Sequence, residues 1–202
     1  MTKMIKFNFN EGNYDLEKIP NLLREKLELK EGESREIERK YLIKKEITKD
    51  LLNNDDFYLS EYIIVEQSYL SIDPEIRIMK KFYPNIDKAK YYLTYKSDGK
   101  MSREELECQI FDNDYVFLKN KLTKTSSIYK EVAIFSKYDE VMGLDYEISN
   151  VNFGDIYIME IEFASEIEAK AFKIPEIINE YIIKEVTYDD DFKMKNYWNR
   201  KY

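Results

Sequence analysis

The sequence predicts an α+β protein built on an eight-stranded antiparallel closed barrel, with helices packed outside. The first observation is that apolar and polar residues alternate with a period of two along most of the chain, which is typical of half-buried strands. The second is that three of these runs carry two glutamates at positions i and i+2, on one face of a strand. Eight strands close into a barrel wide enough for side chains or one small ligand, so a charged face can line its interior.

Eight segments have the alternation expected of strands. A hairpin turn is expected at Ser97-Asp98-Gly99, because these residue types favour tight turns between strands. The predicted strands are Ser34–Ile43, Tyr62–Leu70, Glu75–Phe82, Lys90–Lys96, Ser102–Ile110, Leu122–Ile134, Leu144–Val151 and Ile156–Phe163.

Helices are expected between and around these strands. Ser165 and Glu168 form a capping-box pattern that starts a helix. Pro175 suits the first turn of another, because proline lacks the amide hydrogen that a first turn leaves unpaired. The other predicted helices are Pro20–Leu29, Lys49–Asn54, Asp112–Lys119 and Glu176–Lys184.

These elements indicate one main domain, residues 33–195, with a helical extension at residues 1–32 and a tail at residues 196–202. The leucines of the extension favour a helix that docks on the barrel or plugs one of its ends. A partner or dimer helix, and hence a homodimer, is the alternative. We expect the tail that contains Trp198 to be either packed on the domain or loose.

Composition excludes several kinds of chemistry. The chain has 202 residues and no histidine, so Ser-His-Asp catalysis and histidine-ligated zinc are ruled out. Cys108 is the only cysteine, so no internal disulfide forms. The net charge of −8 argues against nucleic acid as a partner. No apolar run approaches the roughly 20 residues of a membrane span, so we expect no membrane partner and a cytoplasmic location.

The charged strand faces are the candidate site. Taken singly, each fits a solvated sheet face with apolar residues inward. Taken together, three acidic doublets with cations on intervening strands suit a metal–polyphosphate complex, because Mg²⁺ and Mn²⁺ prefer oxygen ligands and Arg and Lys bind phosphate. The doublets are Glu36/Glu38, Glu105/Glu107 and Glu160/Glu162; the cations are Lys40, Arg77, Lys96, Arg103 and Lys124.

The order of these motifs resembles the CYTH, or triphosphate tunnel metalloenzyme, superfamily. The likeness runs from Glu36 to about Lys193 and starts with a Glu-x-Glu-x-Lys strand. The other matching segments are Val65–Leu70, Glu75–Ile78, Tyr92–Lys96, Arg103-x-Glu105-x-Glu107, Met159–Phe163, Glu166–Phe172 and Glu185–Thr187.

The resemblance implies a metal-dependent triphosphatase acting on a small molecule that contains a triphosphate, with Mg²⁺ or Mn²⁺ as cofactor. Lys40, Glu105 and Glu107 would be catalytic; a plain ion pair with Glu38 is the alternative role of Lys40. The implied metal ligands are Glu36, Glu38, Glu107, Glu160 and Glu162. The implied substrate contacts are Lys40, Arg77, Lys96, Arg103 and Lys124, joined by Lys81, which shares the parity of Arg77.

Three positions depart from the superfamily pattern. Met79 replaces a second cation, Ser126 replaces an arginine and Ser149 replaces an aspartate. The predicted site is therefore less basic and less acidic than usual, which leaves a non-catalytic polyphosphate- or nucleotide-binding module as an alternative. A class IV-like adenylyl cyclase is the other alternative, although those enzymes carry a histidine motif that this chain lacks.

Overall fold

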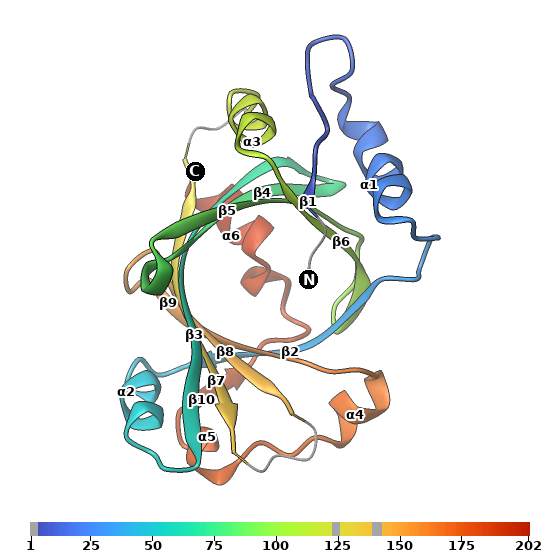
Figure 1. Cartoon of the computed structure of the whole chain (residues 1–202). Helices are drawn as coiled ribbons and strands as arrows, with labels where there is room; N and C mark the ends of the chain where they lie inside the picture. The colour runs from blue at the N-terminus through green and yellow to red at the C-terminus, as the bar shows by residue number, and fades with distance from the viewer. Residues whose placement is uncertain (1–3, 123–125, 139–142) are drawn as a thin grey trace.

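The chain forms a closed eight-stranded antiparallel barrel with helices and two short extra strands outside it (Figure 1). The computed structural model describes residues 4–122, 126–138 and 143–202. The predicted fold class is confirmed. The barrel strands are β2 (Arg35–Ile43), β3 (Phe57–Ile72), β4 (Glu75–Tyr83), β5 (Lys88–Lys96), β6 (Ser102–Ile110), β7 (Ile128–Lys137), β8 (Asp145–Val151) and β9 (Ile156–Glu162).

The barrel closes where β2 meets β6. Around the barrel the strands follow the order β6-β5-β4-β3-β7-β8-β9-β2, and β2 then pairs with β6 again. This seam is short: the paired residues are Arg35 with Glu104, Glu36 with Arg103, and Ile37 with Ser102. Beyond it, β1 (Met4–Ile5) runs parallel to β6 and β10 (Ile182–Glu185) pairs with β2. Both strands satisfy backbone groups that the diverging edges would otherwise leave unpaired.

Apolar side chains lie on the outside of the barrel, where helices cover them. Met159 and Ile161 belong to one buried cluster with residues of α2 (Ile47–Leu52), α4 (Glu166–Ala171) and α5 (Glu176–Asn179). Leu93 and Leu106 belong to a second cluster with α1 (Ile19–Leu27) and α3 (Asp112–Lys119). Because strand residues alternate between faces, this arrangement turns the charged residues inward.

The N-terminal segment docks on the outer wall. The guanidinium of Arg24 in α1 donates to both carboxylate oxygens of Glu104, at 3.2 and 2.6 Å. The backbone amide of Gly32 donates to the same carboxylate at 3.0 Å. The buried carboxylate of Asp114 accepts the backbone amides of Phe7 and Phe9. Of the two placements expected for this helix, docking is therefore the observed one.

The C-terminal helix α6 (Met194–Lys201) covers one end of the barrel, and Figure 1 shows it within the barrel's outline. Met194 and Trp198 pack with the inward-facing Tyr69, Ile128 and Ile158. Trp198 is 3% exposed, and its indole donates to the carbonyl of Ser126 at 2.9 Å. We call this the closed end; the tail is packed there.

Several predicted elements have different bounds. The strand expected at Tyr62–Leu70 is longer and spans Phe57–Ile72. The helix expected at Glu176–Lys184 ends at Asn179, because the following backbone pairs with β2 as β10. The helix expected at Lys49–Asn54 spans Ile47–Leu52. The strand expected at Leu122–Ile134 begins at Ile128, where pairing with β3 begins. Among the described residues, no helix has the length and apolar character needed to cross a membrane.

Candidate active site

The inward-facing side chains surround a cavity of about 660 Å³ in the barrel, a size typical of small-molecule sites. The predicted site residues that the structure describes all line it; Lys124 lies outside the described residues. The alternative of separate solvated faces is thereby replaced by one enclosed site. The charged lining residues of the barrel strands are Glu36, Glu38, Lys40, Glu75, Arg77, Lys81, Lys96, Arg103, Glu105, Glu107, Lys130, Asp145, Glu147, Glu160 and Glu162.

One ion-pair group joins β2 and β9. The register places Lys40 opposite Glu160, and the Lys40 ammonium lies 2.6 Å from Glu160 Oε1 and 3.3 Å from Glu38 Oε1. Burial alone would lower the pKa of Lys40, but the two carboxylates outweigh it and raise that pKa. Burial likewise opposes the charge of Glu160, yet Lys40 and then Lys130 hold the pKa of Glu160 at about 2. Lys40 and Glu160 are therefore both charged at neutral pH.

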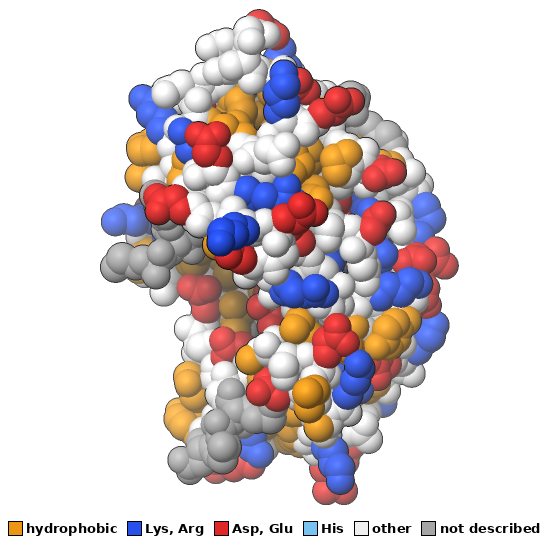
Figure 2. Space-filling model, turned by 90° about the vertical axis from the view of Figure 1, so that its right-hand side faces the viewer, with side chains coloured by type: hydrophobic (Ala, Val, Ile, Leu, Met, Phe, Trp, Pro, Cys, Tyr) orange, Lys and Arg blue, Asp and Glu red, His pale blue; other side chains and the backbone are white. Residues whose placement is uncertain are grey.

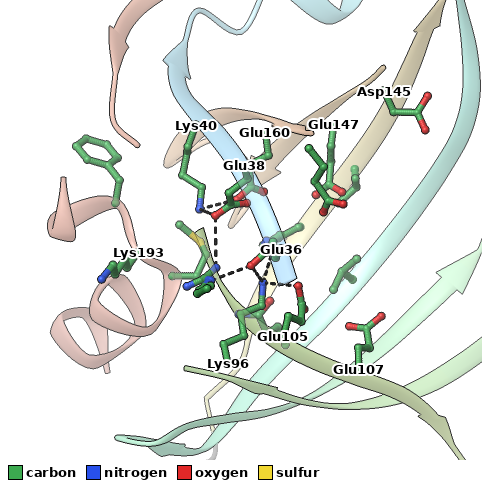
Figure 3. Close-up of a pocket in the computed structure, with 18 of the residues that line it drawn as sticks. Glu36, Glu38, Lys40, Lys96, Glu105, Glu107, Asp145, Glu147, Glu160 and Lys193 are labelled. Atoms are coloured by element: carbon green, nitrogen blue, oxygen red, sulfur yellow. Dashed lines mark hydrogen bonds and ion pairs between the residues drawn. The ribbon is translucent and has the colours of Figure 1, made fainter. Parts of the chain in front are cut away.

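A second group centres on Glu36. Its carboxylate accepts from Lys96 Nζ at 2.7 and 2.8 Å and from Arg103 Nε at 2.8 Å. Burial would raise the pKa of Glu36, but Lys96 and Arg103 hold it well below its ordinary value. Lys96 also lies 3.1 Å from Glu105 Oε2, so a single ammonium serves two carboxylates (Figure 3).

Glu105 and Glu107 have different surroundings although they share a strand face. Burial raises the pKa of Glu105 to about 7, with Lys96 opposing and Glu36 adding to the effect. Burial also acts on Glu107, but Lys81, Arg77 and a hydrogen bond from Thr94 at 3.0 Å lower its pKa. Glu105 is therefore the one of the two that exchanges a proton near neutral pH.

Glu147, Glu162 and Lys130 carry charges that are poorly compensated. Within the described part of the chain, none of the three has an ion-pair partner within 4.0 Å. Burial raises the pKa of Glu147 and lowers that of Lys130. Burial, followed by Glu36 and Glu105, raises the pKa of Glu162 to about 7, although its side chain lies at an exposed rim. A divalent cation beside these carboxylates would remove their mutual repulsion.

The donor set fits a hard cation. Register places Glu160 between Glu147 on β8 and Lys40 on β2, and Glu38 opposite Glu162. Figure 3 shows Glu38, Glu147 and Glu160 directed into the same region of the cavity. All are oxygen ligands, the type that Mg²⁺ and Mn²⁺ prefer. Among the described residues, no three potential ligands already surround a common point, since Lys40 occupies the space between two of them.

Four charged cavity residues of the barrel strands were not predicted as site residues from the sequence: Glu75, Lys130, Asp145 and Glu147. Lys130 is 8% exposed and points inward from β7, between the inward-facing Ile128 and Val132. Its signal was a single lysine on an otherwise apolar strand face. Glu75 lies 3.8 Å from Arg103. Glu147 on β8 pairs with Glu160 on β9. Both follow the parity of their strands, which the sequence displayed.

Comparisons with solved structures place this architecture among known folds. The PH1819 protein from Pyrococcus horikoshii OT3 is 24% identical, with a TM-score of 0.52, and the match covers 67% of this chain and 82% of that one. A conserved hypothetical protein from Pyrococcus furiosus is 27% identical, with a TM-score of 0.50 and coverage of 72% and 86%. The chain shares their fold. An eight-stranded antiparallel barrel with a charged interior is the fold that the resemblance to the CYTH superfamily implies.

A third similar structure is that of the inorganic triphosphatase NE1496, at 24% identity, a TM-score of 0.46, and coverage of 80% of this chain and 93% of that one. No protein-family model matches the sequence, and no curated protein sequence matches it. The assignment of an activity therefore rests on the cavity itself.

Proposed function

We propose that this chain is a metal-dependent phosphohydrolase that cleaves a triphosphate inside the barrel. The observation that carries the proposal is the group of buried cations on the inner wall. A polyanion is a ligand that such a group can bind in exchange for its carboxylates, because triphosphate oxygens accept from Arg and Lys in several directions. These cations are Lys40, Arg77, Lys96, Arg103 and Lys130.

The acidic residues have separate roles in this proposal. Glu38, Glu160 and Glu162, with Glu147 beside them, would hold Mg²⁺ or Mn²⁺. A cation held there supplies charge neutralisation for phosphoryl oxygens and lowers the pKa of a bound water. Lys40 would move from its carboxylates to a phosphate oxygen, since it lies at the centre of the same group.

The remaining residues would position the phosphates and handle the proton. Arg77 and Lys96 both contact Glu105, at 3.4 and 3.1 Å, so a phosphate bound by these cations would lie beside that carboxylate. Glu105 would accept the proton of the attacking water, a role that suits an acid whose pKa is close to the working pH. Glu107 would keep Lys81 and Arg77 oriented, or share the metal. Electrostatic stabilisation of the transferred phosphoryl group is the main contribution expected of such a site.

Phosphate release tests the proposal. The purified chain is incubated with inorganic triphosphate, ATP or thiamine triphosphate, in Mg²⁺, Mn²⁺ or EDTA. We expect metal-dependent release from at least one substrate, and a loss of about 100-fold or more in Glu160→Gln. Glu131→Gln is the matched control, because Glu131 lies on the outer face of β7, where it contacts Tyr62 and Asn150. Release from none of the substrates would reject the hydrolase.

A non-catalytic binding module is the second candidate. It is favoured by the way Lys40, Lys96 and Arg103 already neutralise the carboxylates that would otherwise bind metal. Tight calorimetric binding of triphosphate without phosphate release would support it. Chromatographic detection of cyclic AMP from ATP would instead indicate a cyclase.

A further inference from the structure

The wall of the barrel changes its construction beside Lys40. The pairing of β2 with β6 ends at Ile37 and Ser102, so β2 continues beyond the end of its neighbour. The backbone amide of Glu38 still donates to the carbonyl of Met101 at 2.9 Å. The backbone of Lys40, two residues further on, is bound by a different segment of the chain.

That segment directly follows β10. Lys40 donates its backbone amide to the hydroxyl oxygen of Thr187 at 3.0 Å, and its carbonyl accepts the backbone amide of Val186 at 2.8 Å. Both Val186 and Thr187 line the cavity, and Thr187 is 8% exposed. At Lys40, a side-chain hydroxyl therefore accepts the amide that a carbonyl of a neighbouring strand accepts elsewhere in a sheet.

A carboxylate fixes the direction of this hydroxyl. The hydroxyl oxygen of Thr187 lies 2.9 Å from Glu185 Oε1 and 3.5 Å from the carbonyl oxygen of Lys40. The bond to the carboxylate is the shorter one and is charge-assisted, so the single hydroxyl hydrogen is donated there. A lone pair of the same oxygen then accepts the Lys40 amide.

Arg39 holds the carboxylate in turn. Its guanidinium donates to both oxygens of Glu185, at 2.9 and 2.8 Å. Another nitrogen of the same guanidinium donates to two backbone carbonyls at the end of α4, at 3.2 and 3.1 Å. A chain of hydrogen bonds thus runs from α4 through Arg39, Glu185 and Thr187 to the backbone of Lys40.

The residue held in this way lies at the centre of an ion-pair group. The Lys40 ammonium is 2.6 Å from Glu160 and 3.3 Å from Glu38, and in the proposed function it moves from these carboxylates to a phosphate oxygen. With its backbone fixed, the side chain can move while its starting point stays in place. Displacing such a group by about 1 Å can cost about 100-fold in rate.

We propose that Thr187 is a positioning residue, whose hydroxyl holds the backbone of Lys40 so that the ammonium can reach a phosphate oxygen. This inference rests on the proposed function. Thr187 acts through Lys40 and not on the substrate, because its hydroxyl donates to Glu185 and accepts from Lys40.

Steady-state kinetics test the role of the hydroxyl, with the triphosphate that releases phosphate fastest. Thr187→Val removes the hydroxyl at similar volume and should lower kcat/KM by about 10- to 100-fold. Thr187→Ser keeps the hydroxyl and should retain most of kcat/KM. Equal losses in the two variants, or no loss in Thr187→Val, would overturn the inference.

The matched control is Ser165→Ala. The Ser165 hydroxyl also accepts a backbone amide, that of Glu168 at 3.2 Å, but it does so at the start of α4. Ser165→Ala should leave kcat/KM unchanged. A loss as large as that of Thr187→Val would overturn the inference, because kcat/KM would then report a general loss of structure.

The affinity for inorganic triphosphate separates positioning from such a general loss. Calorimetry in EDTA, where metal-dependent turnover does not occur, compares the unaltered chain, Thr187→Val, Lys40→Met and the double variant. Thr187→Val should weaken binding about tenfold when Lys40 is present, a coupling typical of residues in contact. In Lys40→Met it should have almost no further effect, because the ammonium that it positions is gone. Equal weakening in both backgrounds would overturn the inference.

The proposed function and this inference fail in different ways. If no substrate releases phosphate, the hydrolase is rejected, and the binding measurements alone decide on Thr187. If the unaltered chain also does not bind inorganic triphosphate, the inference is rejected as well. If Thr187→Val does not fold, Glu185→Ala replaces it in the calorimetry, because this variant removes the acceptor that directs the hydroxyl. It should again weaken binding only where Lys40 is present, and equal weakening in Lys40→Met would overturn the inference.

Discussion

Replacing Lys40 with methionine tests whether the buried ion pairs stabilise the barrel. Lys40 lies 2.6 Å from Glu160 and 3.3 Å from Glu38, and its side chain is 9% exposed. Methionine keeps most of the length of the side chain and removes the ammonium. Lys40→Met would leave two carboxylates in the cavity without their shared cation.

The magnitude follows from the pKa of Glu160. Its value of about 2, against an ordinary 4.5, corresponds to about 3 kcal/mol of stabilisation at neutral pH. Breaking a buried ion pair from one side costs about 3–5 kcal/mol, which agrees. Because this carboxyl has a lowered pKa in the folded chain, its contribution is complete above about pH 4.5 and is lost as the pH falls toward 2.

Urea unfolding in EDTA measures the effect. We expect Lys40→Met to lower the free energy of unfolding by about 3–5 kcal/mol at pH 7, and by progressively less below about pH 4.5. The matched control is Lys184→Met. Lys184 is exposed and lies 2.7 Å from Asp189, and the loss of this surface ion pair should cost under about 1 kcal/mol. Equal losses in the two variants, or a loss for Lys40→Met that does not change between pH 7 and pH 3.5, would refute the reasoning.

Three further predictions concern other parts of the molecule. Glu105→Gln should flatten the pH dependence of the melting temperature between about pH 5 and pH 8 in EDTA. A carboxyl group whose pKa is raised to about 7 in the folded chain stabilises the fold at low pH, and this contribution is lost as the pH rises through about 7. An unchanged pH profile of the melting temperature would contradict this prediction. Trp198→Ala should speed hydrogen exchange of the α6 amides and lower stability by about 3–5 kcal/mol at most, whereas unchanged exchange would show that Trp198 does not hold the closed end. Cys108 should resist iodoacetamide until the chain unfolds, because burial raises its pKa to about 12, and labelling of the native chain followed by mass spectrometry measures this.

The mixed surface charge agrees with the composition. On the face shown in Figure 2, Lys and Arg side chains alternate with Asp and Glu and form no broad basic stripe. Arg77 and Lys130 instead point into the barrel from strands β4 and β7. The low dielectric constant of the interior makes the electrostatic interactions of these two charges stronger than those of charges at the surface.

The sequence by itself determined the strands and their faces. Side chains alternate between the two faces of a strand. Once the apolar faces are buried on the outside of the barrel, Glu36, Glu38 and Lys40 must all point into its interior. The same parity already assigned Lys130 to the interior. Lys130 was nevertheless not predicted as a site residue, because one lysine between apolar residues also fits a strand at the edge of a sheet.

Only the tertiary structure decided which charges meet and what closes the barrel. Lys40 pairs with Glu160, which is 120 residues away, because the register between β2 and β9 places them opposite each other. Local patterns carry no information on such registers or on the position of α6 at one end of the barrel. These depend on long-range pairing, and pairing is set by the packing of the whole barrel.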